Sequence, residues 1–240
     1  MSIQDRIQQV ERRIEAACLR SGRRREDIQI VAVTKYVSLE RTMEAYEGGL
    51  SHLGENRWQD AESKWQALSE ERLPEPEGGK PVWHFIGSLQ SRKAKDIVGR
   101  FDYIHSLDRL SLAEAIHKQA ERLGTRVPCF IQVNVSGEAS KHGIEPGELL
   151  PFLEALQAYP AIKPIGLMTM APYEAEPEAT RPVFRALREL RDEARETSAF
   201  GQELNHLSMG MSGDFEVAIE EGATWIRLGS ILVGKEEDEQ

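Results

Sequence analysis

The 240-residue sequence has few cysteines and no long apolar run. Its two cysteines, Cys18 and Cys129, lie far apart and form no CxxC pair, which excludes a disulfide framework and a cysteine-based zinc site. Each lies in an apolar stretch, so both are expected to be buried thiols. No apolar segment approaches the ~18 residues that a membrane span needs. The N-terminus also lacks the apolar region of a signal peptide, so we expect a soluble, cytoplasmic protein without a membrane partner.

An excess of positive charge is also missing. The 30 lysines and arginines face 40 aspartates and glutamates, for a formal net charge of −10. A general nucleic-acid binder should carry a basic electrostatic footprint, so nucleic acid is not an expected partner. The histidines show no metal-ligand spacing, and no metal site is expected.

Short β-branched or apolar segments alternate with helical patterns along the chain. A helix is predicted over residues 1–22, where Ser2-Ile3-Gln4-Asp5 resembles a capping box and Ser21-Gly22 ends the helix. Eight segments have the character of strands: Ile30–Val33, His52–Leu53, Val82–Ile86, Tyr103–His105, Cys129–Val135, Ile165–Met168, Leu204–Ser208 and Trp225–Leu228. Strands that alternate with helices predict right-handed βαβ units and a parallel sheet.

The spacing of these segments favours an α/β fold closed into a barrel. Successive strand ends lie about 28 residues apart, close to the ~31 residues per unit of a (β/α)8 barrel. An open doubly wound sheet also fits the alternation, but no GxGxxG follows the first strand. We therefore expect a single TIM-type barrel domain over residues 1–240. A Pro/Gly-rich surface loop is expected at residues 70–80 and an acidic tail at residues 235–240.

Lys35 stands out among the residues at the carboxyl ends of the predicted strands, where α/β barrels build their active sites. An unperturbed lysine has a pKa of ~10.4 and is protonated and non-nucleophilic at neutral pH. Desolvation or a nearby cation would lower that pKa and permit a Schiff base with a carbonyl compound. The alternative is a rim lysine paired with an acid such as Glu55. Position alone does not decide between the two.

Two Gly/Ser-rich segments, Leu207–Asp214 and Arg227–Ser230, follow the last two predicted strands. Barrels often bind phosphate with the loops after strands seven and eight, through backbone N–H groups. The glycines would let the backbone approach an anion, and Ser208, Ser212 and Ser230 offer hydroxyl donors. The first segment could equally well be a helix start. A reactive lysine opposite a phosphate cradle suggests a phosphorylated aldehyde.

Seven motifs follow one another over nearly the whole chain. They are Ala32-Val33-Thr34-Lys35, Gly54-Glu55-Asn56, Trp83-His84-Phe85-Ile86-Gly87-Ser88-Leu89-Gln90, Gln132-Val133-Asn134-Val135-Ser136, Gly166-Leu167-Met168-Thr169-Met170, Leu207-Ser208-Met209-Gly210-Met211-Ser212 and Ile226-Arg227-Leu228-Gly229-Ser230. Together they resemble the pyridoxal phosphate homeostasis protein family, which is similar to the N-terminal barrel domain of alanine racemase. One departure is Ser91-Arg92-Lys93, where the family usually reads x-Asn-Lys, and it leaves the role of that loop open.

The resemblance implies pyridoxal phosphate held as a Schiff base on Lys35. It places Asn56 beside the cofactor and Arg227 against the pyridine nitrogen or the phosphate. The phosphate-binding motifs contain Ser208, Met209, Ser212, Gly229 and Ser230. His84 lies toward the end of the third predicted strand and is expected to contact the cofactor, although a hydrogen-bonded rim histidine is at least as common.

The kind of activity follows from two further considerations. An arginine at the pyridine nitrogen stays charged and favours an unprotonated ring, which makes the cofactor a poorer electron sink. Two-base racemisation needs a second acid/base group, which alanine racemase takes from a C-terminal β-domain that we do not expect in this chain. Tyr36 would point away from Lys35 if both lay in one strand.

We therefore expect a carrier that stores, buffers or delivers pyridoxal phosphate in intracellular homeostasis, rather than an enzyme. Apo-enzymes that receive the cofactor are candidate partners, and a monomer is expected. Two alternatives stay open. One is a pyridoxal phosphate-dependent racemase-like enzyme, and the other is a class I aldolase-like enzyme that uses Lys35 on a sugar phosphate.

Overall fold

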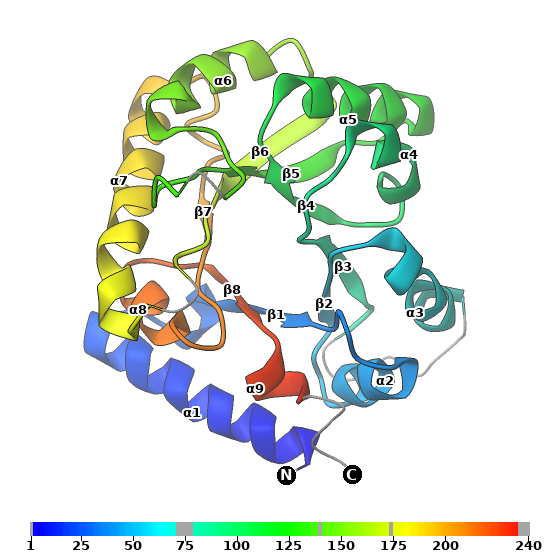
Figure 1. Cartoon of the computed structure of the whole chain (residues 1–240), viewed down its shortest axis with the longest axis vertical. Coiled ribbons are helices and arrows are strands. Elements are labelled where there is room, and N and C mark those ends of the chain that lie inside the picture. Colours follow the sequence, from blue (N-terminus) through cyan, green and yellow to red (C-terminus); the bar gives the residue numbers. More distant parts are fainter. Residues whose placement is uncertain (1, 71–78, 139–140, 173–174, 235–240) are drawn as a thin grey trace.

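Eight parallel strands form a closed barrel in the order β1 to β8 in this computed structural model, which describes residues 2–70, 79–138, 141–172 and 175–234 (Figure 1). The strands are β1 (Gln29–Val33), β2 (His52–Glu55), β3 (Val82–Phe85), β4 (Tyr103–Leu107), β5 (Val127–Gln132), β6 (Ile162–Met168), β7 (His206–Ser208) and β8 (Trp225–Leu228). All eight predicted segments contain a strand, and the TIM-type barrel is confirmed. Most of the loop predicted at residues 70–80 and all of the tail at 235–240 lie outside the described residues.

Helices surround the barrel on the outside (Figure 1). They are α1 (Ile3–Ser21), α2 (Leu39–Glu47), α3 (Trp58–Glu70), α4 (Ala94–Ile97), α5 (Leu110–Leu123), α6 (Leu149–Leu156), α7 (Arg181–Thr197), α8 (Phe215–Glu220) and α9 (Ser230–Val233). The predicted capping box begins α1: Asp5 N donates to Ser2 Oγ at 3.1 Å, and Ser2 N donates to Asp5 Oδ2 at 3.0 Å. Helix α1 packs against α8 and α9, beside the point where β8 pairs with β1.

One strand ends earlier than its apolar run suggests. The run continues to Val135, but β5 stops at Gln132. Asn134 N donates to Ile144 O, and Ile144 N donates to Gln132 O, both at 2.9 Å. The following loop therefore takes over the backbone hydrogen bonds that would have extended the strand.

Alternation along the strands divides the apolar side chains into two layers. The larger layer lies between sheet and helices, and the smaller one fills the barrel interior with Val31, Phe130, Ile165, Met168 and Trp225. Both cysteines are buried free thiols, as predicted. No helix within the described residues is long and apolar enough to cross a membrane.

Candidate functional site

A cavity of about 520 Å³ opens at the carboxyl ends of the strands, the face on which α/β barrels carry their active sites. Its walls come from β1, β8 and the loops after β3, β6 and β7. Five of the nine cofactor-binding residues expected from the sequence line it: Lys35, Ser212, Arg227, Gly229 and Ser230. Residues that are more than 190 positions apart in the sequence thus share one wall.

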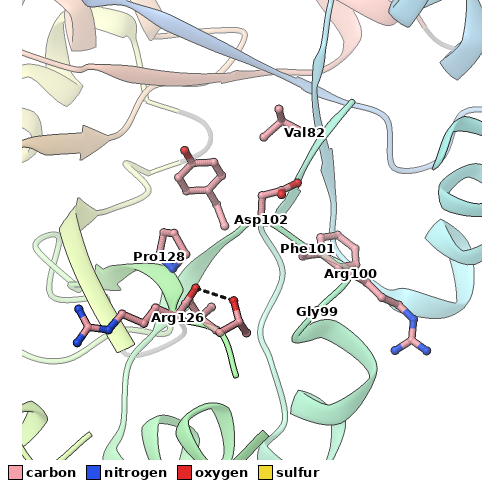
Figure 2. A pocket seen from close by; sticks show the side chains of 10 residues that line it. Val82, Gly99, Arg100, Phe101, Asp102, Arg126 and Pro128 are labelled. Atoms are coloured by element: carbon pink, nitrogen blue, oxygen red, sulfur yellow. Dashed lines mark hydrogen bonds between the residues drawn. The ribbon is translucent and has the colours of Figure 1, made fainter. Parts of the chain in front are cut away.

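A second cavity of about 490 Å³ lies at the opposite end of the barrel, where β3, β4 and β5 begin. Figure 2 shows the side chains of Arg100 and Arg126 pointing away from each other. Asp102 uses Oδ2 to accept a hydrogen bond from Trp83 N at 2.7 Å, and burial raises the pKa of its carboxyl group. Because its charged groups do not converge, this cavity is not the candidate site.

Lys35 lies in a tight turn rather than in a strand. Strand β1 ends at Val33, and Val37 N donates to Thr34 O at 3.3 Å to close the turn. Lys35 is half-buried, and its Nζ makes no hydrogen bond or ion pair with a described residue. Its amine is therefore available to a molecule bound in the cavity.

Tyr36 adopts a left-handed backbone conformation with φ of 69°, which is uncommon for a residue other than glycine. Its ring centroid lies 5.4 Å from Lys35 Nζ, and its side chain is exposed. The alternation that would separate the two side chains does not apply, because neither residue lies in β1. The condition under which Tyr36 would point away from Lys35, that both residues lie in one strand, is therefore not met.

Glu55 does not pair with Lys35, because another lysine occupies its carboxylate. Lys64 Nζ donates to Glu55 Oε1 at 2.9 Å and to Thr34 O at 2.7 Å, and Thr34 Oγ1 donates to the same carboxylate oxygen at 2.7 Å. Both charged side chains are buried. Burial raises the pKa of Glu55, and Lys64 opposes this effect.

Sequence reasoning missed Lys64, although the sequence contained a signal. Lys64 occupies the same face of α3 as Ala61 and Leu68, the spacing at which a helix buries one face. A cation on such a face requires a buried partner. This partner network holds the carbonyl group of Thr34 and so fixes the start of the turn that carries Lys35.

Arg227 is the most buried charged side chain that lines the cavity, at 5% exposure. Its Nη1 donates to Ser208 Oγ at 2.7 Å, and its Nη2 donates to Thr169 O at 3.1 Å. Burial lowers the pKa of Arg227 to about 10, an effect that Asp214 opposes. The group stays charged at neutral pH, and three of its five N–H donors have no partner among the described residues.

The two Gly/Ser-rich loops meet at the cavity. Gly229 N donates to Ser212 Oγ at 3.3 Å, which joins the loop after β7 to the loop after β8. Gly210 has φ of 95°, and a Cβ there would lie 2.6 Å from Ala218 Cβ, so the turn requires glycine. A Cβ at Gly213 would meet no atom within 4 Å, so this part of the loop leaves open space.

Asp214 is a lining residue that sequence reasoning treated only as part of a possible helix start. Helix α8 does begin directly after it, at Phe215. Met211 N donates to Asp214 Oδ1 at 2.6 Å, and burial raises the pKa of this carboxyl group. Among the described residues, Asp214 is thus a third ionisable side chain in the cavity wall, after Lys35 and Arg227.

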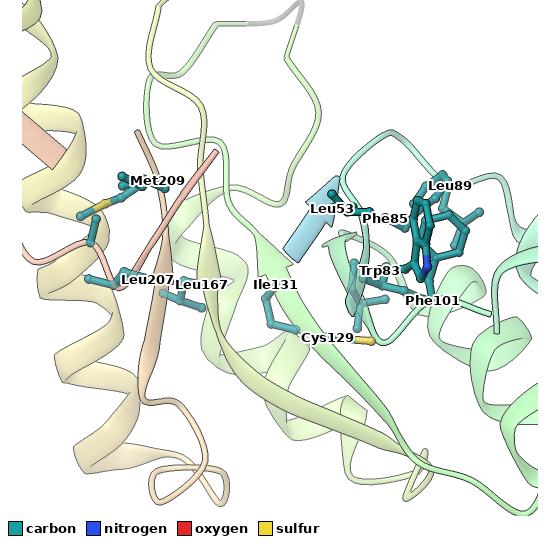
Figure 3. Packing of buried hydrophobic residues seen from close by; sticks show 14 of the residues in the cluster. Leu53, Trp83, Phe85, Leu89, Phe101, Cys129, Ile131, Leu167, Leu207 and Met209 are labelled. Atoms are coloured by element: carbon teal, nitrogen blue, oxygen red, sulfur yellow. The ribbon is translucent and has the colours of Figure 1, made fainter. Parts of the chain in front are cut away.

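The other four expected residues do not line this cavity. Ser208 and His84 are fully buried inside the barrel, where Ser208 accepts the hydrogen bond from Arg227. Met209 lies one residue beyond β7 and packs with Leu207 in the layer between sheet and helices (Figure 3). Asn56 lines a neighbouring cavity of about 390 Å³ together with Lys93 of the unusual Ser91–Lys93 segment.

Comparison with known proteins shows similarity over nearly the whole chain. The family model for the alanine racemase N-terminal domain matches residues 7–237. The pyridoxal phosphate homeostasis protein of Aquifex aeolicus is 44% identical over 235 residues, which cover 98% of this chain and 99% of that protein. The protein of the same name from Pseudomonas aeruginosa is 37% identical, with 97% and 95% covered.

Solved structures with a similar fold include a member of the same family and an alanine racemase. PipY of Synechococcus elongatus with pyridoxal phosphate bound has a TM-score of 0.79 and 34% identity, and the match covers 97% of this chain and 100% of PipY. Alanine racemase of Clostridium difficile shares the fold at a TM-score of 0.69 with 17% identity, and 57% of that enzyme is covered. The motif-based resemblance is confirmed, and the chain belongs to the pyridoxal phosphate homeostasis protein family.

Proposed function

We propose that this protein binds pyridoxal phosphate as a Schiff base on Lys35 and acts as a carrier in intracellular pyridoxal phosphate homeostasis. The observation that carries the proposal is the unpaired Lys35 amine, which faces the same cavity as Arg227 and the two Gly/Ser-rich loops. The names of the full-length relatives and the cofactor in PipY support it.

The donor set fits this cofactor group by group. Pyridoxal phosphate presents an aldehyde, a ring nitrogen and a phosphate, and when bound it supplies an electrophilic carbon. The cavity offers the amine of Lys35, the unused N–H donors of Arg227, and the hydroxyl groups of Ser212 and Ser230. Asn56 Oδ1 is buried without a partner among the described residues, an acceptor beside the Lys35 turn that a ligand group could satisfy.

Each expected residue has a role in this proposal. Ser212 and Ser230 would hold the phosphate with their hydroxyl groups, and Gly229, whose N–H donates to Ser212 Oγ, would let the backbone approach it. Arg227 would donate to the ring nitrogen and, because the guanidinium group stays charged, would keep that nitrogen unprotonated. Ser208 and His84 act through Arg227, Met209 supports the loop by packing, and Asn56 borders the turn of Lys35.

A carrier is favoured over an enzyme by what lines the cavity. Besides Lys35 and Arg227, the described lining offers one ionisable side chain, Asp214, and its Oδ1 is engaged by Met211 N. Tyr36 lies close to Lys35 but is 71% exposed, so no closed pocket holds it, and its hydroxyl group accepts a long hydrogen bond of 3.5 Å from Asn56 Nδ2. A racemase needs a proton donor on each face of the cofactor, and neither group is held for that task.

Absorption spectra test the proposal directly. The purified protein should be yellow, borohydride should fix the cofactor on the peptide that contains Lys35, and Lys35→Ala should abolish both signals. Lys93→Ala changes a lysine of the neighbouring cavity and should leave them intact. A colourless protein that borohydride traps only with a sugar phosphate would support the aldolase alternative instead.

Carrier and enzyme are separated by two further assays. The loaded protein should restore activity to a cofactor-requiring apo-enzyme, and Lys35→Ala should not. Racemisation of a panel of amino acids at a typical turnover of ~10 per second would overturn the carrier assignment. The same proposal includes that the protein is located in the cytoplasm and is a monomer. The two buried free thiols are compatible with a reducing compartment. Sedimentation would measure the mass of the protein in solution.

A further inference from the structure

Histidines occupy the barrel interior where branched aliphatic side chains usually predominate. His84 and His105 are fully buried, and His52 and His206 are half-buried below them. A buried imidazole is costly unless both ring nitrogens find suitable surroundings. An apolar side chain of similar size would fill the same space without needing hydrogen-bond partners. The hydrogen bonds that these histidine rings make are therefore the feature to explain.

Three of these rings form one continuous hydrogen-bonded chain, here called the histidine chain (His52, His84 and His105). His52 Nδ1 lies 2.9 Å from His84 Nε2, and His84 Nδ1 lies 2.9 Å from His105 Nε2. His105 Nδ1 lies 2.8 Å from Ser208 Oγ, which accepts a hydrogen bond from Arg227 at 2.7 Å. The histidine chain therefore runs from the first residue of β2 to the arginine of the cavity.

The rings are neutral at neutral pH. Burial lowers the pKa of His84 well below its usual range, and the neighbouring His105 and His52 add to this. Burial also lowers the pKa of His105, with a further contribution from the positive charge of Arg227, and burial lowers that of His52. A neutral imidazole has one N–H donor and one bare acceptor nitrogen.

This arrangement leaves the histidine chain two consistent states. Either Ser208 donates to His105 and every ring carries its proton on Nε2, or every ring carries its proton on Nδ1 and His105 donates to Ser208. If His84, the middle ring, had the wrong tautomer, two N–H groups would meet on one side of it and two lone pairs on the other; a terminal ring in the wrong tautomer would create one such clash with its neighbouring ring. The tautomers of the three rings are therefore locked to one another.

Aromatic packing holds the rings in place. His84 stacks on Tyr103 with 4.7 Å between centroids and 6° between planes, and His105 stacks on Phe130 at 4.3 Å. Trp225 contacts both His52 and His84. The surrounding titratable groups are few: burial raises the pKa of Tyr103 and keeps it neutral, and Asp214 acts on Arg227 at the cavity end. Because these contacts hold the planes of the rings, a ring can reverse its hydrogen bonds only by changing its tautomer and not by rotating.

We propose that the histidine chain positions Arg227 and couples its hydrogen bond with Ser208 to the protonation of His52 at the opposite end of the barrel. His52 is half-buried, and its Nε2 has no hydrogen-bond partner among the described residues. When His52 carries both protons, its Nδ1 must donate to His84, which selects the state in which His105 donates to Ser208. Ser208 oxygen is then shared by two donors and holds Arg227 more weakly.

Nitrogen NMR of ligand-free protein with labelled histidine tests this coupling, because Nδ1 and Nε2 shifts identify each tautomer. The three rings should share one tautomer near neutral pH. Acidification through the titration of His52 should move the Nδ1 resonance of His105, although these two residues do not touch. Mixed tautomers, or a His105 resonance that ignores the titration of His52, would overturn the proposal.

Two substitutions at the outer end separate coupling from structure. His52→Phe should abolish the pH response of His105, and His52→Asn, which hydrogen bonds but does not titrate, should abolish it too. His206→Phe is the matched control, since His206 is a half-buried interior histidine bonded to Thr224 and not to the histidine chain. An unchanged response of His105 in folded His52→Asn would refute the coupling.

Bound cofactor gives a second measurement, and this part alone rests on the proposed function. The two states differ by the strength of one hydrogen bond to Arg227, so cofactor affinity should change with pH on the order of fivefold through the titration of His52. The change should be absent in His52→Asn and present in His206→Phe. If no cofactor binds, the NMR result still decides the inference independently.

Discussion

Replacing Lys64 with methionine removes the cationic partner of a fully buried carboxylate. Lys64 and Glu55 keep 6% and 0% of their side chains exposed, and their charged atoms lie 2.9 Å apart. Removing one partner of a buried ion pair costs ~3–5 kcal/mol, because the other charge stays buried and uncompensated. Since a whole domain is stable by only ~5–15 kcal/mol, Lys64→Met should lose a large share of the free energy of unfolding.

The loss should depend on pH with a defined sign. Burial raises the pKa of Glu55 in the folded protein, and without Lys64 the rise must be larger. A group whose folded pKa is raised stabilises the fold below its unfolded pKa and loses that contribution as pH rises through the folded pKa. Lys64→Met should therefore be least stable relative to the wild type near neutral pH and recover part of the difference in mild acid.

Urea denaturation at several pH values measures both effects. Lys93→Met is the matched control, because Lys93 is 43% exposed and pairs with Asp96 at 3.6 Å, a surface pair whose loss should cost at most ~1 kcal/mol. Glu55→Gln combined with Lys64→Met removes both charges and should regain most of the stability. A loss below ~1 kcal/mol for Lys64→Met, or one that is the same at every pH, would refute the reasoning.

Two further predictions concern the glycines of the loop after β7 and the carboxylate of Glu221, which follows α8. Gly210→Ala should destabilise the protein by more than ~1 kcal/mol in thermal unfolding, because it combines a positive φ with a Cβ contact of 2.6 Å, whereas Gly213→Ala enters open space and should be nearly neutral. The pKa of Glu221 is lowered: burial opposes the shift, but hydrogen bonds from Arg185 and Arg181 outweigh it. Glu221→Gln should therefore cost stability at neutral pH, and the difference from the wild type should vanish as pH falls through the lowered pKa.

The sequence by itself determined the fold class of this protein. The eight strands could be located because β-branched composition, helical periodicity and an even spacing of units are local properties. The same holds for the capping box at Ser2 and for the helix start that follows Asp214. Lys35 and the two Gly/Ser-rich loops could be singled out because they follow strands whose carboxyl ends must meet at one face of a barrel.

Only the tertiary structure decided which side chains meet. Barrel closure brings His105 to Ser208 across 103 positions of sequence, so no local pattern could reveal that His84 belongs to an interior chain rather than to the rim. Likewise, the choice of Lys64 over Lys35 as the partner of Glu55 depends on how α3 packs on the barrel. Side-chain pairing is a property of distant segments in contact, and sequence spacing along one segment carries no record of it.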